Sequence, residues 1–304
     1  MASSLRLPRP RLPGWIKVKV ETGAGRAEVT RLLAELKLNT VCAGARCPNL
    51  GECFHRRTAT FLIMGKHCTR HCKFCSIGGE NPDRLEFDEP QRVAEAAKRL
   101  GLRFVVVTSV TRDDLADGGA AVFAATIAAI RETLPETGIE VLTPDFNGDF
   151  AALETVLAAG PTVFNHNLET VERLTPVIRD RATYRGSLAV LRHAAAWHGG
   201  AIPVKSGLMA GLGETDAEIE EALADLREAG VTLLTIGQYL PPSPSHWPLA
   251  RYVEPETFAK WRETALALGF TRVASAPLVR SSYHAESMAV PKNPEISEKN
   301  HFRA

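Results

Sequence analysis

The sequence predicts an α/β fold in which repeated strand–helix units form either a partial (β/α)6 TIM-like barrel or an open doubly wound sheet. Three observations predict this fold. Six apolar runs rich in β-branched residues recur along the chain, helical patterns separate them, and the length of 304 residues suits one large domain. Repeated units of this kind imply parallel strands joined by right-handed crossovers.

Each predicted strand is a short apolar run between polar residues. In chain order the strands cover 60–64, 103–108, 139–142, 162–165, 202–206 and 232–236. The helical patterns cover 89–100, 119–134, 149–159, 168–174 together with 184–198, 215–229 and 256–268. Asp216 suits the first turn of its helix, and Gly230 and Gly269 stand where a C-terminal cap glycine belongs.

Composition and charge exclude two classes of protein. Lys and Arg total 36 against 35 Asp and Glu, so no excess of positive charge indicates binding to nucleic acid. No apolar run approaches the roughly 18 residues of a membrane span. The basic arm at 1–19 lacks the apolar core of a secretory signal, and an organelle transit peptide is its less favoured interpretation. We expect this arm and the polar tail at 291–304 to be flexible.

Polar residues stand at the ends of five predicted strands that are otherwise apolar. In parallel α/β folds, functional groups gather at the carboxyl ends of the strands. The pattern therefore favours an active site at this rim over ordinary solvated loops. The residues are Thr108 with Ser109, Pro144 with Asp145, Asn165 with His166 and Asn167, Lys205 with Ser206, and residues 237–239.

All six cysteines lie in two groups of three near the start of the chain. Their spacings are C-x4-C-x5-C and C-x3-C-x2-C, formed by Cys42, Cys47 and Cys53, and by Cys68, Cys72 and Cys75. The cationic residues around the second group argue against buried core cysteines, and no signal peptide supports disulfides. Zinc usually takes four ligands, which neither triplet supplies by itself.

Iron–sulfur clusters fit the two triplets better than these alternatives. Three thiolates on a four-iron cluster leave one iron without a cysteine, which in an enzyme is a position where substrate can bind. Two triplets thus indicate two clusters. We expect the neighbouring Lys and Arg residues to offset the cluster charge and to lower the pKa of the thiols.

The second triplet, with Phe74 before its last cysteine and a place just after the first predicted strand, resembles the radical S-adenosylmethionine (SAM) superfamily. The resemblance implies a partial β/α barrel with the cluster in its first loop. It also implies that SAM chelates the open iron, and that one electron cleaves SAM to give methionine and a 5′-deoxyadenosyl radical that removes hydrogen from an unactivated carbon.

The first triplet resembles the auxiliary-cluster motif of the lipoyl synthase family. Further similar segments are RDDL at 112–115 with DGG at 117–119, PDF at 144–146, NHN at 165–167 with ETV at 169–171, KSGLM at 205–209 with GLGET at 211–215, GQYL at 237–240 and RSSY at 280–283. The resemblance covers about residues 12–286. Thr143 departs from the aliphatic residue expected there. The implied organisation is an N-terminal extension at 1–58, a barrel at 59–270 and a C-terminal extension at 271–304.

The resemblance implies a reaction and its cofactors. Two sulfur atoms would be inserted at carbons 6 and 8 of a protein-bound octanoyl chain, with SAM and two [4Fe-4S] clusters as cofactors. The auxiliary cluster on Cys42, Cys47 and Cys53 would supply the sulfur, and Ser282 would ligate its fourth iron, with Ser281 as the alternative. Contacts to SAM are expected from Asn165, Asn167, Glu169 and Lys205. No further catalytic residue is assigned, and residues 112–114 are expected to form an internal ion-pair network.

The resemblance also implies the partners. These are octanoylated lipoyl carrier domains (acyltransferase subunits of 2-oxoacid dehydrogenases and the glycine cleavage H protein), a flavodoxin- or ferredoxin-type electron donor, and an iron–sulfur carrier that rebuilds the auxiliary cluster. We expect a cytoplasmic monomer without a nucleic-acid partner or a membrane span. The alternatives are another radical SAM sulfur-inserting enzyme, biotin-synthase-like or methylthio-transferring, and a non-catalytic metal-binding or electron-carrier protein.

Overall fold

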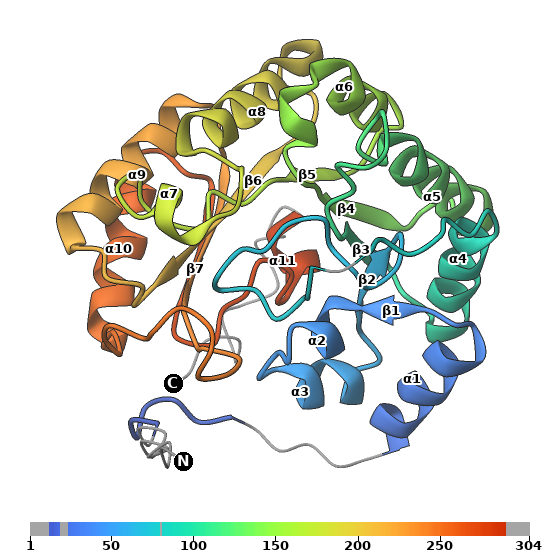
Figure 1. Cartoon of the computed structure of the whole chain (residues 1–304), viewed down its shortest axis with the longest axis horizontal. Coiled ribbons are helices and arrows are strands. Elements are labelled where there is room, and N and C mark those ends of the chain that lie inside the picture. The colour runs from blue at the N-terminus through green and yellow to red at the C-terminus, as the bar shows by residue number, and fades with distance from the viewer. Residues whose placement is uncertain (1–11, 19–23, 80, 290–304) are drawn as a thin grey trace, which may run out of the picture.

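The computed structural model describes residues 12–18, 24–79 and 81–289. Most of the arm expected at 1–19, and the tail expected at 291–304, lie outside these residues. The described strands form one curved sheet in the order β1 to β8, with helices around its outside (Figure 1). Within the described ranges no helix is long and apolar enough to cross a membrane.

The sheet is parallel except at its first strand. β1 pairs antiparallel with β2, and every later strand pairs parallel with the one before it. The two end strands are not paired with each other in the described chain, so the barrel is partial. The strands are β1 (Asn39–Thr40), β2 (Thr60–Ile63), β3 (Phe104–Ser109), β4 (Gly138–Leu142), β5 (Val163–Asn165), β6 (Val204–Ala210), β7 (Leu233–Gln238) and β8 (Arg272–Ser275).

The predicted helices lie on the outside of this sheet. Capping residues in the sequence explain where several of them begin and end. In α9 the Thr215 side chain accepts a hydrogen bond from the Glu218 backbone while the Glu218 side chain accepts one from Thr215, which forms a capping box. Gly230 and Gly269 follow their helices with positive φ, as predicted. The helices are α1 (Ala24–Glu35), α2 (Val41–Gly44), α3 (Leu50–His55), α4 (Glu89–Leu100), α5 (Ala120–Thr133), α6 (Phe150–Ala158), α7 (Thr175–Ile178), α8 (Tyr184–Ala196), α9 (Asp216–Glu228), α10 (Pro255–Ala267) and α11 (Ala285–Ala289), with 3₁₀ turns at Phe146–Gly148 and Trp197–Gly199.

The α/β partial-barrel prediction is confirmed, and the six predicted strands are β2 to β7. The prediction of a helix at 168–174 is wrong. Glu169 has a positive φ of 71°, accepts a hydrogen bond from the Met209 backbone and donates one to the Gly207 carbonyl, so it forms a single bridge to β6, and a turn follows at 172–174. A short helix, α7, follows it. β8 and β1 were not predicted from the sequence.

The C-terminal segment covers the end of the barrel at which the strands begin. In Figure 1 α11 lies within the ring of strands, and it contacts β3 and β4. Arg272, at the start of β8, donates hydrogen bonds to the carbonyls of Ser287 and Met288. Met288 packs in a small apolar cluster with Val163 and Leu233 near the amino ends of their strands. The opposite, carboxyl-end rim therefore remains open for a site.

Candidate functional site

The loop after β2 carries the second cysteine triplet, and backbone hydrogen bonds fix it to the rim of the barrel. The Thr111 backbone N–H donates to Cys68 Sγ at 3.3 Å, and the Asp180 backbone N–H donates to Cys72 Sγ at 3.4 Å. The Lys73 N–H also donates to the Ile178 carbonyl at 2.8 Å. Segments that follow β3 and β5 therefore hold the loop in place.

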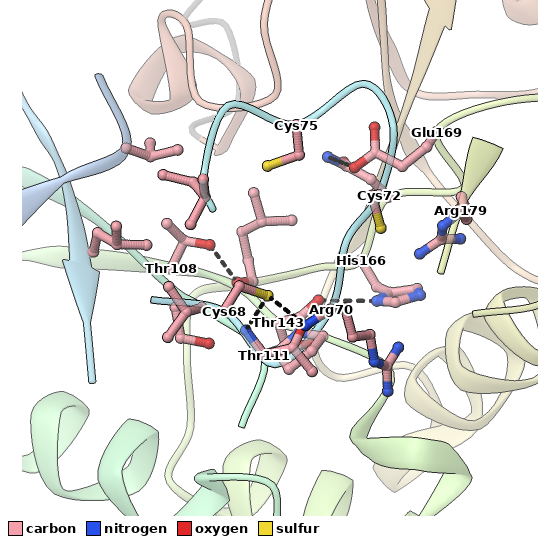
Figure 2. A pocket seen from close by; sticks show the side chains of 18 of the residues that line it. Cys68, Arg70, Cys72, Cys75, Thr108, Thr111, Thr143, His166, Glu169 and Arg179 are labelled. Atoms are coloured by element: carbon pink, nitrogen blue, oxygen red, sulfur yellow. Dashed lines mark hydrogen bonds between the residues drawn. The ribbon is translucent and has the colours of Figure 1, made fainter. Parts of the chain in front are cut away.

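Cys68, Cys72 and Cys75 line one pocket together with the carboxyl ends of β3, β4 and β5 (Figure 2). Three of the five polar strand ends predicted from the sequence thus meet here. Lys205 with Ser206, and residues 237–239, do not line this pocket, because β6 continues to Ala210 and leaves Lys205 inside the strand. The polar residues of the lining are Arg70, Thr108, Ser109, Thr111, Thr143, His166, Asn167, Glu169 and Arg179.

Arg70 ties the cysteine loop to the neighbouring loops. Its buried guanidinium donates to both carboxylate oxygens of Asp113 at 2.8 and 2.9 Å and to both of Asp145 at 2.7 and 2.9 Å. Burial by itself would raise the pKa of each aspartate, but the hydrogen bonds and charge of Arg70 hold both pKa values below their usual range. Arg112 pairs with Asp114 at 2.8 Å, which agrees with an internal ion-pair network at 112–114.

A second chain of hydrogen bonds reaches the pocket wall through His166. Its Nδ1 donates to the Thr143 carbonyl at 2.9 Å, and its Nε2 lies 3.0 Å from Ser187 Oγ. Burial and the nearby Arg179 lower the pKa of His166 to about 4, so the ring is neutral and Nε2 accepts from Ser187. Ser187 Oγ in turn accepts a hydrogen bond from Arg179 at 2.8 Å. The arrangement fixes the Arg179 side chain beside Cys72.

The four residues expected to contact SAM separate into two pairs. Asn167 and Glu169 line the pocket, where Asn167 Nδ2 donates to Glu169 Oε1 at 3.1 Å and burial raises the pKa of Glu169. Asn165 and Lys205 lie inside the barrel. Lys205 Nζ donates to both oxygens of Glu140 at 2.9 and 3.0 Å, and Asn165 donates to the same carboxylate at 2.8 Å. Neither residue of this second pair lines the pocket.

The first cysteine triplet lies on α2, α3 and the turn between them. Cys42 is buried in α2, the Cys47 N–H donates to the Cys42 carbonyl at 3.0 Å, and Cys53 is in α3. Burial, together with the nearby charges of Cys42 and Cys47, raises the pKa of Cys53 to about 12. The three thiols are therefore close enough to influence one another.

The segment 278–284 folds against this triplet from the other end of the chain. Asn49 Nδ2 donates to the Leu278 carbonyl at 2.7 Å, and Tyr283 Oη donates to Glu52 Oε1 at 3.0 Å. Arg280 is close enough to Cys47 for their charges to interact. The fold thus brings the RSSY residues to the cysteines that precede them by more than two hundred positions.

The two serines of this segment differ in their contacts. Ser281 Oγ donates to Asn167 Oδ1 at 3.0 Å, so its hydroxyl is hydrogen bonded to a residue that lines the pocket. Ser282 is half-buried, and within the part of the chain that the structure describes its hydroxyl makes no hydrogen bond. Ser282 is therefore the serine whose oxygen can bind another ligand without losing a bond.

The expectation that basic neighbours lower the pKa of the thiols is wrong for Cys72 and Cys75. Burial raises the pKa of both, to about 12 for Cys75, although the Asp180 N–H and Arg179 act in the opposite direction on Cys72. The neighbouring Lys73 is exposed, and its ammonium lies 5.6 Å from the centre of the Trp247 ring. Iron must therefore displace the thiol protons when it binds.

The side chains around the cysteines suit the iron–sulfur clusters that the two triplets imply. Three thiols at one pocket suit soft iron, and several buried polar atoms of the same wall lack a protein partner: Ser109 Oγ, Thr143 Oγ1 and Arg179 Nε. Such atoms indicate a polar ligand. Over the described ranges, no three His, Cys, Asp or Glu side chains converge to hold a single metal ion. The thiolates of a cluster bind different irons, so they do not need to converge on one point.

Sequence comparison finds two family matches. Residues 62–237 match the radical SAM superfamily, and residues 4–47 match the N-terminal domain of lipoyl synthase of the radical SAM family. The chain is 54% identical over 273 residues to a lipoyl synthase of Rubrobacter xylanophilus, which covers 90% of this chain and 85% of that protein. It is also 54% identical over 276 residues to the lipoyl synthase of Thermus thermophilus, with the same two coverages.

Structural comparison finds distant neighbours of the same fold. Methylornithine synthase superposes with a TM-score of 0.52 at 15% identity and covers 90% of this chain and 88% of its own. A maturase of the [FeFe]-hydrogenase gives 0.53 at 13% identity, with coverages of 83% and 68%. At this identity the likeness supports the fold alone.

Proposed function

Because the chain belongs to the lipoyl synthase family of the radical SAM superfamily, we propose that its two cysteine triplets hold two clusters with separate tasks. The chain is an enzyme, a sulfurtransferase that inserts two sulfur atoms at carbons 6 and 8 of a protein-bound octanoyl chain. Its cofactors are SAM and two [4Fe-4S] clusters. When bound, these groups supply the radical that removes hydrogen and the sulfur that replaces it.

In our proposal Cys68, Cys72 and Cys75 hold the cluster that binds SAM. The support is that these thiols open on the pocket with the unpartnered polar atoms, while the cysteines of the first triplet, on α2, α3 and the turn between them, do not line that pocket. In this proposal the residues around the pocket orient SAM. Arg179, fixed by Ser187, is suited to an anionic group of the ligand, and Glu169 is suited to a cationic one.

Asn167 and Glu169 are our candidates for direct contact with SAM. Both border the pocket and are already hydrogen bonded to each other. Contact of SAM with Asn165 or Lys205 stays a prediction. Contact with Lys205 requires it to exchange at least one of its bonds to Glu140, whereas Asn165 Oδ1 is buried without a hydrogen-bond partner among the described residues and is free to accept one.

We assign the auxiliary cluster to Cys42, Cys47 and Cys53, with Ser282 as its fourth ligand. The observation that carries this assignment is the fold of 278–284 onto the first triplet, through Asn49 and Tyr283. An alkoxide is a harder ligand than thiolate and matches iron–sulfur less well. The iron that Ser282 holds would therefore be the first to leave when the cluster gives up sulfur.

The substrates are octanoylated carrier proteins. That these are acyltransferase subunits of 2-oxoacid dehydrogenases and the glycine cleavage H protein is part of the proposal. So are a flavodoxin- or ferredoxin-type electron donor, an iron–sulfur carrier for cluster rebuilding, a monomeric state and a cytoplasmic location.

The direct test is an anaerobic assay with an octanoyl-lysine peptide, SAM and dithionite, followed by mass spectrometry of the peptide. The expected product carries two sulfur atoms, and two molecules of 5′-deoxyadenosine appear for each molecule of product. A product with one sulfur, or a methylthio product, would support a different radical SAM sulfur-inserting enzyme. Absence of both sulfur insertion and SAM cleavage in brown, iron-loaded protein would support an electron carrier.

A further inference from the structure

The residue next to Ser282 is hydrogen bonded to the side chains that we expect to contact SAM. Ser281 Oγ donates to Asn167 Oδ1 at 3.0 Å, and Asn167 Nδ2 donates to Glu169 Oε1 at 3.1 Å. The two bonds use opposite ends of one amide group, so Asn167 connects Ser281 to Glu169. We call this connection the Ser281 chain, and it joins the C-terminal segment to the lining of the pocket.

A glycine in β6 makes room for the Ser281 chain. A methyl group on Gly207 would lie 2.7 Å from Asn167 Oδ1, 2.8 Å from Thr235 Oγ1 and 2.9 Å from Ser281 Oγ. These separations are well below the roughly 3.5 Å of ordinary non-bonded contact. The bond between Ser281 and Asn167 therefore forms at this place because residue 207 has no side chain.

At the pocket end of the chain, the backbone of Glu169 is fixed. Its N–H and its carbonyl are both hydrogen bonded to the backbone of β6, at 2.9 Å each, and they hold a positive φ that a residue with a side chain adopts only when its surroundings enforce it. Glu169 is close enough to Cys72 and Cys75 for its charge to act on both thiols (Figure 2). A ligand that binds its carboxylate therefore acts on the side chains of the Ser281 chain rather than on the backbone.

At the other end of the chain, the segment 278–284 is attached on two sides. On the side of the first triplet its attachments are the hydrogen bonds of Asn49 and Tyr283 described above. On the side of the pocket its attachment is the hydrogen bond of Ser281. Ser282 stands in the sequence directly between Ser281 and Tyr283, so a shift of Ser281 changes where Ser282 Oγ lies.

We propose that Ser281 is a positioning residue that couples the binding of SAM to the placement of Ser282. This inference rests on the proposed function, in which SAM contacts Asn167 and Glu169. When SAM engages these two side chains, the Ser281 chain is held in one arrangement and the segment 278–284 opens less often. The coupling is reciprocal, so a protein in which Ser281 holds this segment binds SAM more tightly than one in which it does not.

Amide hydrogen exchange with and without SAM tests the coupling in the cluster-loaded, full-length protein. Ser281→Ala removes the hydroxyl that begins the chain, and Gly207→Ala keeps that hydroxyl but fills the space it needs. Ser281→Ala decides the outcome by itself if Gly207→Ala does not fold. Ser275→Ala is the matched control, because it removes a serine hydroxyl that donates to the Phe258 carbonyl at 2.8 Å, outside the chain. Mass spectrometry follows exchange of residues 278–284, calorimetry gives the affinity for SAM, and iron analysis shows that both triplets are loaded.

In the parent protein we expect SAM to slow exchange of residues 278–284 by about fivefold, the effect of about one hydrogen bond. In Ser281→Ala this slowing should disappear and SAM should bind about fivefold more weakly. Ser275→Ala should match the parent. If Ser281 has only a structural role, Ser281→Ala will exchange faster by the same factor with and without SAM and will bind SAM normally, which overturns the proposal. It is also overturned if SAM does not slow exchange in the parent, or if Ser275→Ala has the same effect as Ser281→Ala. Failure of the proposed function is distinct, since the iron-loaded parent protein would then not bind SAM at all.

Discussion

Arg70 joins the loops that surround the pocket lined by Cys68, Cys72 and Cys75. It is one of the most buried charges in the molecule, and it joins the cysteine loop to Asp113 after β3 and to Asp145 after β4. The pair of carboxylates could not remain ionised and buried without it. Removing one partner of a buried ion pair is far more costly than replacing the whole group.

We therefore predict that Arg70→Met destabilises the protein by about 3–5 kcal/mol. The double variant with Asp113→Asn should recover part of this loss, because one uncompensated charge has been removed. Since Arg70 lowers the pKa of both aspartates, its stabilisation is present above their ordinary pKa of about 4 and is lost as the pH falls through the lowered values. Thermal unfolding of the parent and variant between pH 3 and about 7 checks this. Equal stability at neutral pH would contradict the assigned role.

Ser282 and Ser281 give a second prediction for single residues. Ser282→Ala should cleave SAM at the normal rate but lower formation of the lipoyl product by at least about tenfold, because the auxiliary cluster loses a ligand. Ser281 is bonded to Asn167, so Ser281→Ala should leave the iron content of the auxiliary site unchanged. Iron analysis together with measurement of 5′-deoxyadenosine and product separates the two. Normal turnover by Ser282→Ala would exclude it as the ligand.

Among the elements, those whose apolar pattern is local were predictable from the sequence. The strand at 60–64 is β2, and the helix at 89–100 is α4, with its bounds unchanged. Elements that depend on distant partners were not predictable. β8 is short and became a strand because β7 pairs with it, and the segment at 168–174 is not helical because Glu169 bridges to β6. A helical spacing of apolar residues in that segment could not reveal a competing strand.

For the site, too, residues marked by a local pattern were predictable and residues that depend on the folded structure were not. The cysteines were predictable because their spacing is local, and Asn167 and Glu169 because they follow a strand end. Arg70 and Arg179 were missed as site residues, and His166 was predicted only as part of a polar strand end, without a role of its own. The roles of Arg70 and His166 depend on hydrogen bonds to Asp145 and Thr143, which lie 75 and 23 positions away in the chain. Arg179 is bonded to Ser187, eight positions later, but its place at the pocket depends on how the segment after β5 folds. Lys205 was misplaced at a strand end because the continuation of β6 through Gly207 has no strong strand signal.

The contact between α3 and the segment 278–284 gives a prediction at the scale of elements. Its hydrogen bonds do not involve the cysteine thiols, so the segment that carries Ser282 should stay seated when no cluster is bound. We predict that Tyr283→Phe and Asn49→Ala each raise amide hydrogen exchange of residues 278–284 in the cluster-free protein. Loss of a hydrogen bond worth about 1 kcal/mol should raise the exchange rate several-fold. Exchange unchanged from the parent would show that the cluster, not this contact, holds the segment.

At the scale of the whole molecule, the fold keeps the two triplets on separate supports. One triplet is held by the rim of the barrel and opens on the pocket, and the other is held between α2, α3 and the C-terminal segment. The barrel interior, with its buried Lys205–Glu140 pair, connects the rim to the region that α11 closes. If each triplet holds its cluster as proposed, this division allows one cluster to be consumed without dismantling the site that binds SAM.

Because the two triplets are separate, we predict that removing a cysteine from one of them stops a different step of the reaction than removing a cysteine from the other. Cys72→Ala should abolish cleavage of SAM, because its thiol borders the pocket and is bonded by the Asp180 backbone. Cys47→Ala should still produce 5′-deoxyadenosine but insert no sulfur, since Cys47 lies with Arg280 at the other site. Chromatography of 5′-deoxyadenosine and mass spectrometry of the peptide, with iron counts for each variant, measure both steps. Lipoyl product from Cys47→Ala, or unchanged SAM cleavage by Cys72→Ala, would show that the tasks are not divided between the triplets as the fold indicates.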